Sequence, residues 1–123
     1  MFNYIIIAIA VWLLIAFIRY KKGSVNSSHS ILTSAMRGNL PRLKKCIEKG
    51  IEINFQGTGG ITALSHASNS GHIEMVEYLI NHGANLDIQN NKGYTALAVA
   101  ALSNHIEIVD LLITNGADKK III

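Results

Sequence analysis

The sequence predicts an all-α solenoid of about three helix-turn-helix units, preceded by one apolar N-terminal helix. Two observations support this fold class. First, Gly-Ile-Thr-Ala-Leu at 60–64 returns thirty-three residues later as Gly-Tyr-Thr-Ala-Leu at 93–97. Second, residues 2–18 form an uncharged, mainly apolar run. A fixed period of this size is typical of stacked repeat proteins, in which each unit buries its apolar face against its neighbours.

The repeat extends beyond these short segments. Residues 71–80 match residues 104–113, and His-Gly-Ala-Asn at 82–85 matches Asn-Gly-Ala-Asp at 115–118. A weaker first copy begins at Gly38, thirty-three residues before Gly71. The period therefore divides the chain into repeats at about 29–59, 60–92 and 93–123.

Helical periodicity supports the division into units. Ile73, Val76 and Leu79 follow the spacing of a helix with one apolar face, and residues 106–113 repeat that pattern. Gly83 and Gly116 come directly after these segments, where a helix commonly ends in a left-handed residue. We therefore expect the equivalent helices to stack through equivalent faces.

The repeated segments also resemble a known family. Thr-Ala-Leu-Ser-His-Ala at 62–67 and Thr-Ala-Leu-Ala-Val-Ala at 95–100 are similar to the Thr-Pro-Leu-His-x-Ala segment of ankyrin repeats. They depart from it by Ala in place of Pro and by Ser65 or Ala98 in place of His. The resemblance covers residues 29–123, and it implies paired antiparallel helices joined by hairpin-like fingers. It also assigns His72 and His105 to helix packing.

The resemblance implies a protein-binding module. In ankyrin-repeat proteins, partners usually contact the finger tips and the exposed positions of the first helix in each unit. Tyr94 and Leu102 are the expected anchors, because interface energy concentrates on buried aromatic and apolar side chains. The matching positions of this chain are Met36, Arg37, Thr58, Gly59, Ile61, Asn69, Ser70, Asn91, Lys92, Tyr94, Leu102 and Ser103.

The apolar N-terminal run predicts a membrane anchor. Its seventeen residues span about 26 Å as a helix, close to the roughly 30 Å of a bilayer core. Basic residues follow the run at Arg19, Lys21 and Lys22, and none precedes it. This pattern favours an uncleaved single-pass helix over a signal peptide, with residues 2–18 in contact with the lipid bilayer. Because basic residues flank a membrane helix on its cytoplasmic side, the repeats are expected in the cytoplasm. Residues 1–22 would form the anchor and its basic flank, and 23–28 a flexible linker. Loss of residues 1–22 by cleavage, giving an exported periplasmic or secreted protein, stays open, although the small residues Ala8-Ile9-Ala10 lie inside the apolar run and not after it.

Charge and cysteine usage exclude several functions. The chain has eleven Lys and Arg and eight Asp and Glu, and the three excess positive charges lie beside the apolar run. The repeats therefore have no net positive charge that would indicate binding of nucleic acid. Cys46 is the only cysteine and occupies the apolar position of Leu79 and Leu112, which predicts a buried thiol. The histidines lack the spacing of a zinc site, and the glycines at 57–60 lack the Lys that follows in a phosphate loop. We therefore expect no enzyme activity, catalytic residue, metal or cofactor.

The sequence thus predicts a membrane-anchored adaptor or scaffold that binds another protein. An inhibitor or immunity protein that neutralises a specific toxin or enzyme is the alternative within the same class. The C-terminal residues Ile121–Ile123 form a poor cap for the last unit. Packing on the last helix, coverage by a partner or the membrane, and self-association with a second copy all remain open for this tail.

Overall fold

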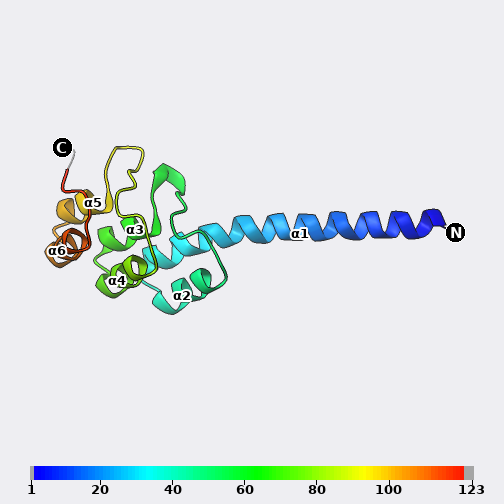
Figure 1. The fold of residues 1–123 in the computed structure, drawn as a ribbon, viewed down its shortest axis with the longest axis horizontal. Helices are drawn as coiled ribbons and strands as arrows, with labels where there is room; N and C mark the ends of the chain where they lie inside the picture. The colour runs from blue at the N-terminus through cyan, green and yellow to red at the C-terminus, as the bar shows by residue number, and fades with distance from the viewer. Residues whose placement is uncertain (1, 121–123) are drawn as a thin grey trace.

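A computed structural model describes residues 2–120, with side chains at 3–19 and 28–120. Over residues 2–120 the chain is all-helical, with no strand, which confirms the predicted all-α class. The elements run in chain order (Figure 1): α1 (Phe2–Arg37), α2 (Leu40–Glu48), the 3-10 turn η1 (Thr58–Gly60), α3 (Ala63–Ser70), α4 (Ile73–Asn81), α5 (Ala96–Leu102) and α6 (Ile106–Thr114).

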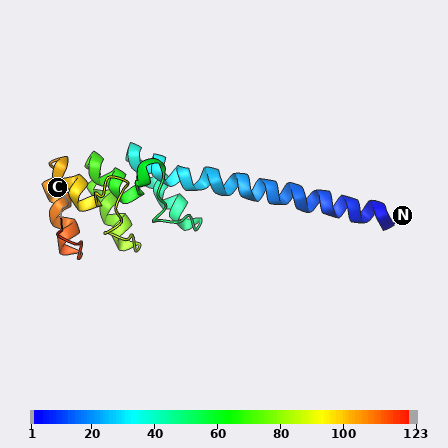
Figure 2. The ribbon, with the colours of Figure 1, turned by 90° about the horizontal axis from the view of Figure 1, so that it is seen from above.

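Three helix pairs stand side by side in a row. The last turns of α1 pair with α2, α3 pairs with α4, and α5 pairs with α6. The first helices form one layer, because α3 packs against both α1 and α5. The remainder of α1 projects away from the row as a single long helix (Figures 1 and 2). Two extended loops connect the pairs, and we call them finger 1 (residues 49–62) and finger 2 (residues 82–95).

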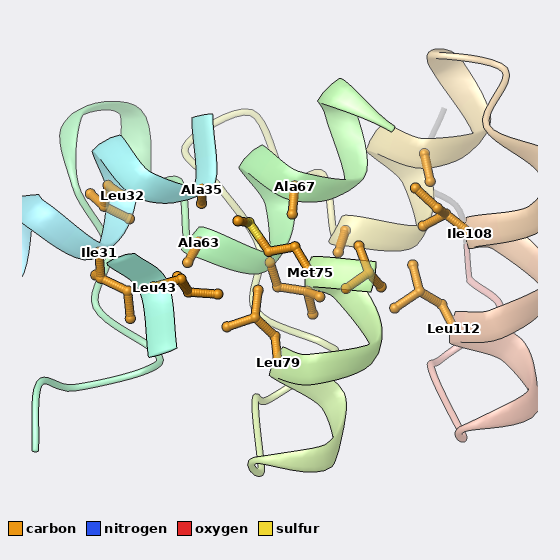
Figure 3. Packing of buried hydrophobic residues seen from close by; sticks show 14 of the residues in the cluster. Ile31, Leu32, Ala35, Leu43, Ala63, Ala67, Met75, Leu79, Ile108 and Leu112 are labelled. Carbon is orange, nitrogen blue, oxygen red and sulfur yellow. The ribbon is translucent and has the colours of Figure 1, made fainter. Parts of the chain in front are cut away.

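The core follows the sequence period. Leu79 and Leu112, at the same period position of the second and third units, are completely buried and point into one apolar interior, which Leu43 from the second helix of the first unit also enters (Figure 3). Ile31 near the end of α1 closes the core at the first unit. Cys46 is also buried, as predicted from its period-related position. Each unit therefore contributes the same face of its second helix to one continuous core.

The predicted helix ends are confirmed. Gly83 has a φ of 86°, and its N–H donates to the carbonyl oxygen of Ile80 at 3.1 Å. The next N–H, from Ala84, donates to Leu79 at 3.0 Å. These two bonds satisfy carbonyl groups that a helix end otherwise leaves free. Gly116, with a φ of 91°, ends α6 through the same pair of bonds.

The linker that was predicted in the N-terminal region is part of a helix. The expected flexible linker at 23–28 lies inside α1, which continues without a break. Helix formation is cooperative, so extending an existing helix adds one hydrogen bond for each residue fixed, and Gly, Ser and Asn weaken a helix by about 1 kcal/mol or less each. Helical residues on both sides therefore outweigh the local preference of this segment for a loop.

The first half of α1 carries exposed apolar side chains around its whole circumference. Tyr4 is 80% exposed and Trp12 is 68% exposed, and the neighbouring Ile, Val, Leu and Phe side chains are exposed as well. In the part of the chain that the structure describes, no helix reaches the combined length and apolarity that a membrane crossing requires. The predicted transmembrane helix is therefore not supported. The predicted apolar tail at 121–123 lies outside the described residues.

Candidate functional site: a groove between the fingers and the first helices

The tip of finger 1 is a tight turn of glycines. The N–H of Gly57 donates to the carbonyl oxygen of Ile61 at 3.0 Å, which closes the tip. Gly59 and Gly60 have φ values of 77° and 72°, a region that side-chain-bearing residues rarely adopt. The glycines at 57–60 therefore serve a turn, as their sequence context indicates, and the turn exposes the side chain of Thr58 and the backbone of Gly59.

Finger 2 is organised around one asparagine. Asn90 Oδ1 accepts hydrogen bonds from the N–H groups of Lys92 at 2.9 Å and Tyr94 at 3.0 Å. The N–H of Asn90 donates in turn to the carbonyl oxygen of Tyr94 at 2.9 Å. An asparagine that bonds to the backbone two residues ahead stabilises a turn locally. Lys92 and Tyr94 are thereby held on the same short loop.

The two finger tips are joined to each other. The N–H of Asn91 donates to the carbonyl oxygen of Gly59 at 2.9 Å, and Gln56 Nε2 donates to the carbonyl oxygen of Gln89 at 3.1 Å. A Cβ atom on Gly60 would lie 2.6 Å from Asn91 Oδ1, so the tips approach closely only because a glycine stands there. The fingers consequently form one wall and do not act as two independent loops.

Threonine caps set the opposite wall. Thr62 Oγ1 accepts from the N–H of Ser65 at 3.2 Å, and Thr95 Oγ1 accepts from the N–H of Ala98 at 3.3 Å. Side-chain oxygens at this position satisfy a free N–H of the first helical turn. Helices α3 and α5 therefore begin in the same way, and His66 and Val99 occupy equivalent positions one turn into each helix.

Between these walls lies an open groove of about 460 Å³. Its apolar lining comes from Met36, Ile61, Tyr94 and Val99. Its polar lining comes from Ser65, His66, Asn69, Asn90, Asn91 and Lys92, and Gly59 completes it. The groove thus combines four chain segments: the end of α1, both finger tips, α3 and α5.

Most of the binding residues predicted from the sequence meet in this groove. They are Met36, Gly59, Ile61, Asn69, Asn91, Lys92 and Tyr94. Arg37, Thr58, Ser70, Leu102 and Ser103 do not line it. Ser103 is nevertheless connected to the groove, because its hydroxyl donates to Asn69 Oδ1 at 2.8 Å. Leu102 is 70% exposed at the end of α5 and lies outside the groove lining.

Four lining residues were missed by sequence reasoning: Ser65, His66, Asn90 and Val99. His66 and Val99 share one period position and so could have been recognised together, but both fall within the family segment that is expected to form helix starts. Burial lowers the pKa of His66 below its ordinary value of 6.5. Its imidazole is therefore neutral at physiological pH, and it can donate or accept one hydrogen bond at each nitrogen according to tautomer.

The lining of the groove contains no Asp, Glu or Cys. Over the residues whose side chains the structure describes, no group of three or more His, Cys, Asp and Glu is placed to hold a metal ion. The lining offers an apolar floor with amide, hydroxyl, imidazole and ammonium groups around it. Such a surface can bind a ligand through burial of apolar area and hydrogen bonds.

Comparison with known proteins agrees with this architecture. A family model described as ankyrin repeats in three copies matches residues 31–122. A search of curated proteins found no match. The matched region begins in the last turns of α1 and includes both fingers and every later helix. The chain therefore belongs to the ankyrin-repeat family.

Proposed function

We propose that the chain binds a partner protein through the groove between the fingers and the first helices. Ankyrin repeats are protein-interaction modules, and the family therefore supports the general function. The observation that supports the specific surface is the convergence of three separate parts of the sequence on one groove: Met36, Ile61, and the pair Lys92 and Tyr94.

The construction of the groove favours tight binding. Binding loses free energy when loops must be ordered, and here the finger tips are already joined by the Asn91–Gly59 and Gln56–Gln89 hydrogen bonds. Tyr94 offers a large amphipathic ring, the kind of side chain on which interface energy concentrates. It is half-buried before a partner arrives, so less of its side-chain freedom is lost on binding.

A Tyr94→Ala variant tests this surface. The full chain in a mild detergent would be used to capture partner proteins, which mass spectrometry would identify and titration would quantify. We expect Tyr94→Ala to weaken binding by about 2 kcal/mol, because a central aromatic anchor is lost. Leu102→Ala is the matched control, since Leu102 was expected at the interface but lies outside the groove. Unchanged affinity of a folded Tyr94→Ala variant would place the partner elsewhere. Loss of a captured enzyme's or toxin's activity would narrow the function to an inhibitor or immunity protein.

We also propose that residues 2–18 attach the chain to a lipid bilayer with the repeats on the cytoplasmic side. The support is the exposed apolar surface of this half of α1, together with the basic residues Arg19, Lys21 and Lys22 that follow it. A helix suits this environment because its backbone hydrogen bonds are satisfied internally. Attachment would remove the exposed apolar side chains of this run from water, which is favourable by roughly 25 cal/mol for each Å² of apolar surface buried.

Fractionation separates this attachment from its alternative. We expect the full chain to remain with membranes after carbonate extraction, and a C-terminal reporter to be active only in its cytoplasmic form. A mature protein that begins after residue 20, or a reporter active outside the cytoplasm, would show instead that the chain is exported. Neither outcome affects the groove, whose residues all lie beyond position 35.

A further inference from the structure

The acidic residues of the repeats are confined to the second helices and the segments after them. All eight acidic residues lie on second helices or in the segments that directly follow them: Glu48, Glu52, Glu74, Glu77, Asp87, Glu107, Asp110 and Asp118. The first-helix segments at 29–37, 63–70 and 96–102 contain no Asp or Glu, and neither do the finger tips at 56–61 and 89–94. The cationic residues on this face are Arg37 and Lys92.

Lys92 is the cation of the groove itself. It lines the same space as Tyr94, Ile61 and Met36, and no carboxylate lines that space. Two of the amide oxygens of the lining are already engaged, since Asn90 Oδ1 accepts two backbone N–H groups and Asn69 Oδ1 accepts the hydroxyl of Ser103. An apolar floor therefore adjoins an ammonium group that the groove itself does not neutralise.

This inference rests on the proposed function and names the chemistry of the partner. We propose that the groove receives a peptide segment of the partner in which a large apolar side chain stands directly beside an Asp or Glu. The apolar side chain packs on Met36, Ile61 and Tyr94, and the carboxylate pairs with Lys92. A basic segment would bring like charge against Lys92 with no acidic residue of the groove to offset it, and like charges placed together suppress binding.

His66 gives the proposal a second, independent readout. The groove that His66 lines also includes Met36 from α1, Val99 from α5, and Lys92 and Tyr94 from finger 2, and its lining contains no Asp or Glu. A partner carboxylate brought into the groove favours the protonated imidazole, so binding takes up a proton. Affinity for an acidic segment should therefore rise as the pH falls from 8 to 6, a range in which the partner carboxylate stays ionised. An uncharged or basic segment gives no such rise.

The test uses a phage-displayed library of random peptides, selected against the full chain in a mild detergent. We expect enrichment of peptides that carry an aromatic or large aliphatic residue next to Asp or Glu. A synthetic peptide from this pool should bind the Lys92→Gln variant about fivefold more weakly, the upper range for a single solvent-accessible ion pair. Lys119→Gln is the matched control, because Lys119 is an exposed lysine outside the groove. In His66→Val, which copies Val99, the peptide should lose its stronger binding at pH 6.

The outcomes separate this inference from the proposed function. Enriched peptides that depend on Tyr94 but carry no acidic residue, or that bind Lys92→Gln and Lys119→Gln equally well, overturn the acidic-segment inference and leave the groove as the binding surface. Peptides whose binding survives Tyr94→Ala overturn the groove itself. Failure to enrich any peptide above an empty-bead selection also overturns the inference, because a preformed groove with one charge should select a short segment.

Discussion

Gly71 and His105 pack against each other across the boundary between the second and third units. A Cβ atom on Gly71 would lie 2.7 Å from Cε1 of the His105 ring, and His105 Nε2 lies 3.1 Å from the carbonyl oxygen of Asn69. The same contact joins the first two units, where a Cβ on Gly38 would lie 2.6 Å from Cε1 of His72. The histidine of one unit thus fills the space that the preceding glycine leaves open, which gives the expected packing role of His72 and His105 a specific partner.

Replacing Gly71 with Ala should lower the free energy of unfolding by about 2–4 kcal/mol. About 1–2 kcal/mol comes from a side chain held at positive φ, and the rest from crowding against the His105 ring. Gly83→Ala is the matched control, because Gly83 has a similar φ and a Cβ there would meet nothing within 4 Å. Urea unfolding followed by circular dichroism measures both. Equal losses, or no recovery when His105→Ala is added to Gly71→Ala, would show that the contact does not determine this position.

Replacing Ser68 with Ala should stabilise the fold by about 1 kcal/mol. The Ser68 hydroxyl is completely buried and has no hydrogen-bond partner in the described part of the chain, and an unsatisfied buried polar group is costly. Ala35 and Ala101 stand at the same period position in the other units.

Ser34→Ala is the control for this change, because Ser34 is equally buried but its hydroxyl donates to the carbonyl oxygen of Ser30 at 2.8 Å. Ser34→Ala should not raise the stability of the fold. Thermal unfolding of the full chain in a mild detergent would rank the two variants, and a gain from Ser34→Ala as large as that from Ser68→Ala would contradict the explanation.

Stability should depend on pH through His66. Burial lowers its pKa in the folded state, whereas the unfolded chain restores the ordinary value of 6.5. Between these two pKa values the unfolded state binds more protons, so the contribution of neutral His66 is complete above about pH 6.5 and decreases as the pH falls toward the folded pKa. Comparing wild type with His66→Val by thermal unfolding from pH 7.5 to 5.5 isolates this contribution. If the melting temperatures of the two proteins change with pH in parallel, His66 does not make this contribution.

Asp87 should stabilise the third unit specifically. Its Oδ1 accepts the N–H of Asp118 at 2.8 Å, just as Asn54 Oδ1 accepts the N–H of Asn85 at 2.8 Å one unit earlier. We expect Asp87→Ala to lower the free energy of unfolding by about 1 kcal/mol. The amide of Asp118 should then exchange with solvent faster, as local opening becomes easier. Asp87→Asn should retain the bond, because Asn54 makes it in the first unit. Unchanged exchange at Asp118 in the Ala variant would contradict this assignment.

The sequence by itself determined what each unit does locally. The thirty-three-residue period, the apolar spacing of Ile73, Val76 and Leu79, and the glycine after each second helix predicted the helix pairs, their ends and the burial of Cys46. These features depend on neighbours within one or two helical turns, or on positions that the repeat makes equivalent. The resemblance to ankyrin repeats added the finger and first-helix surface, and seven of its predicted binding residues line the groove.

Only the tertiary structure decided how the units meet. Stacking brings finger 2 against the first helix of the preceding unit, which adds His66 and Asn90 to the groove and leaves Leu102 outside it. It also determines that Gly71 faces His105, while the continuous α1 replaces the expected linker. The groove and the Gly71–His105 contact depend on the offset between neighbouring units, which is fixed by the packing of whole helix faces. The continuous α1 depends on the cooperative extension of a helix through residues that would form a loop if isolated.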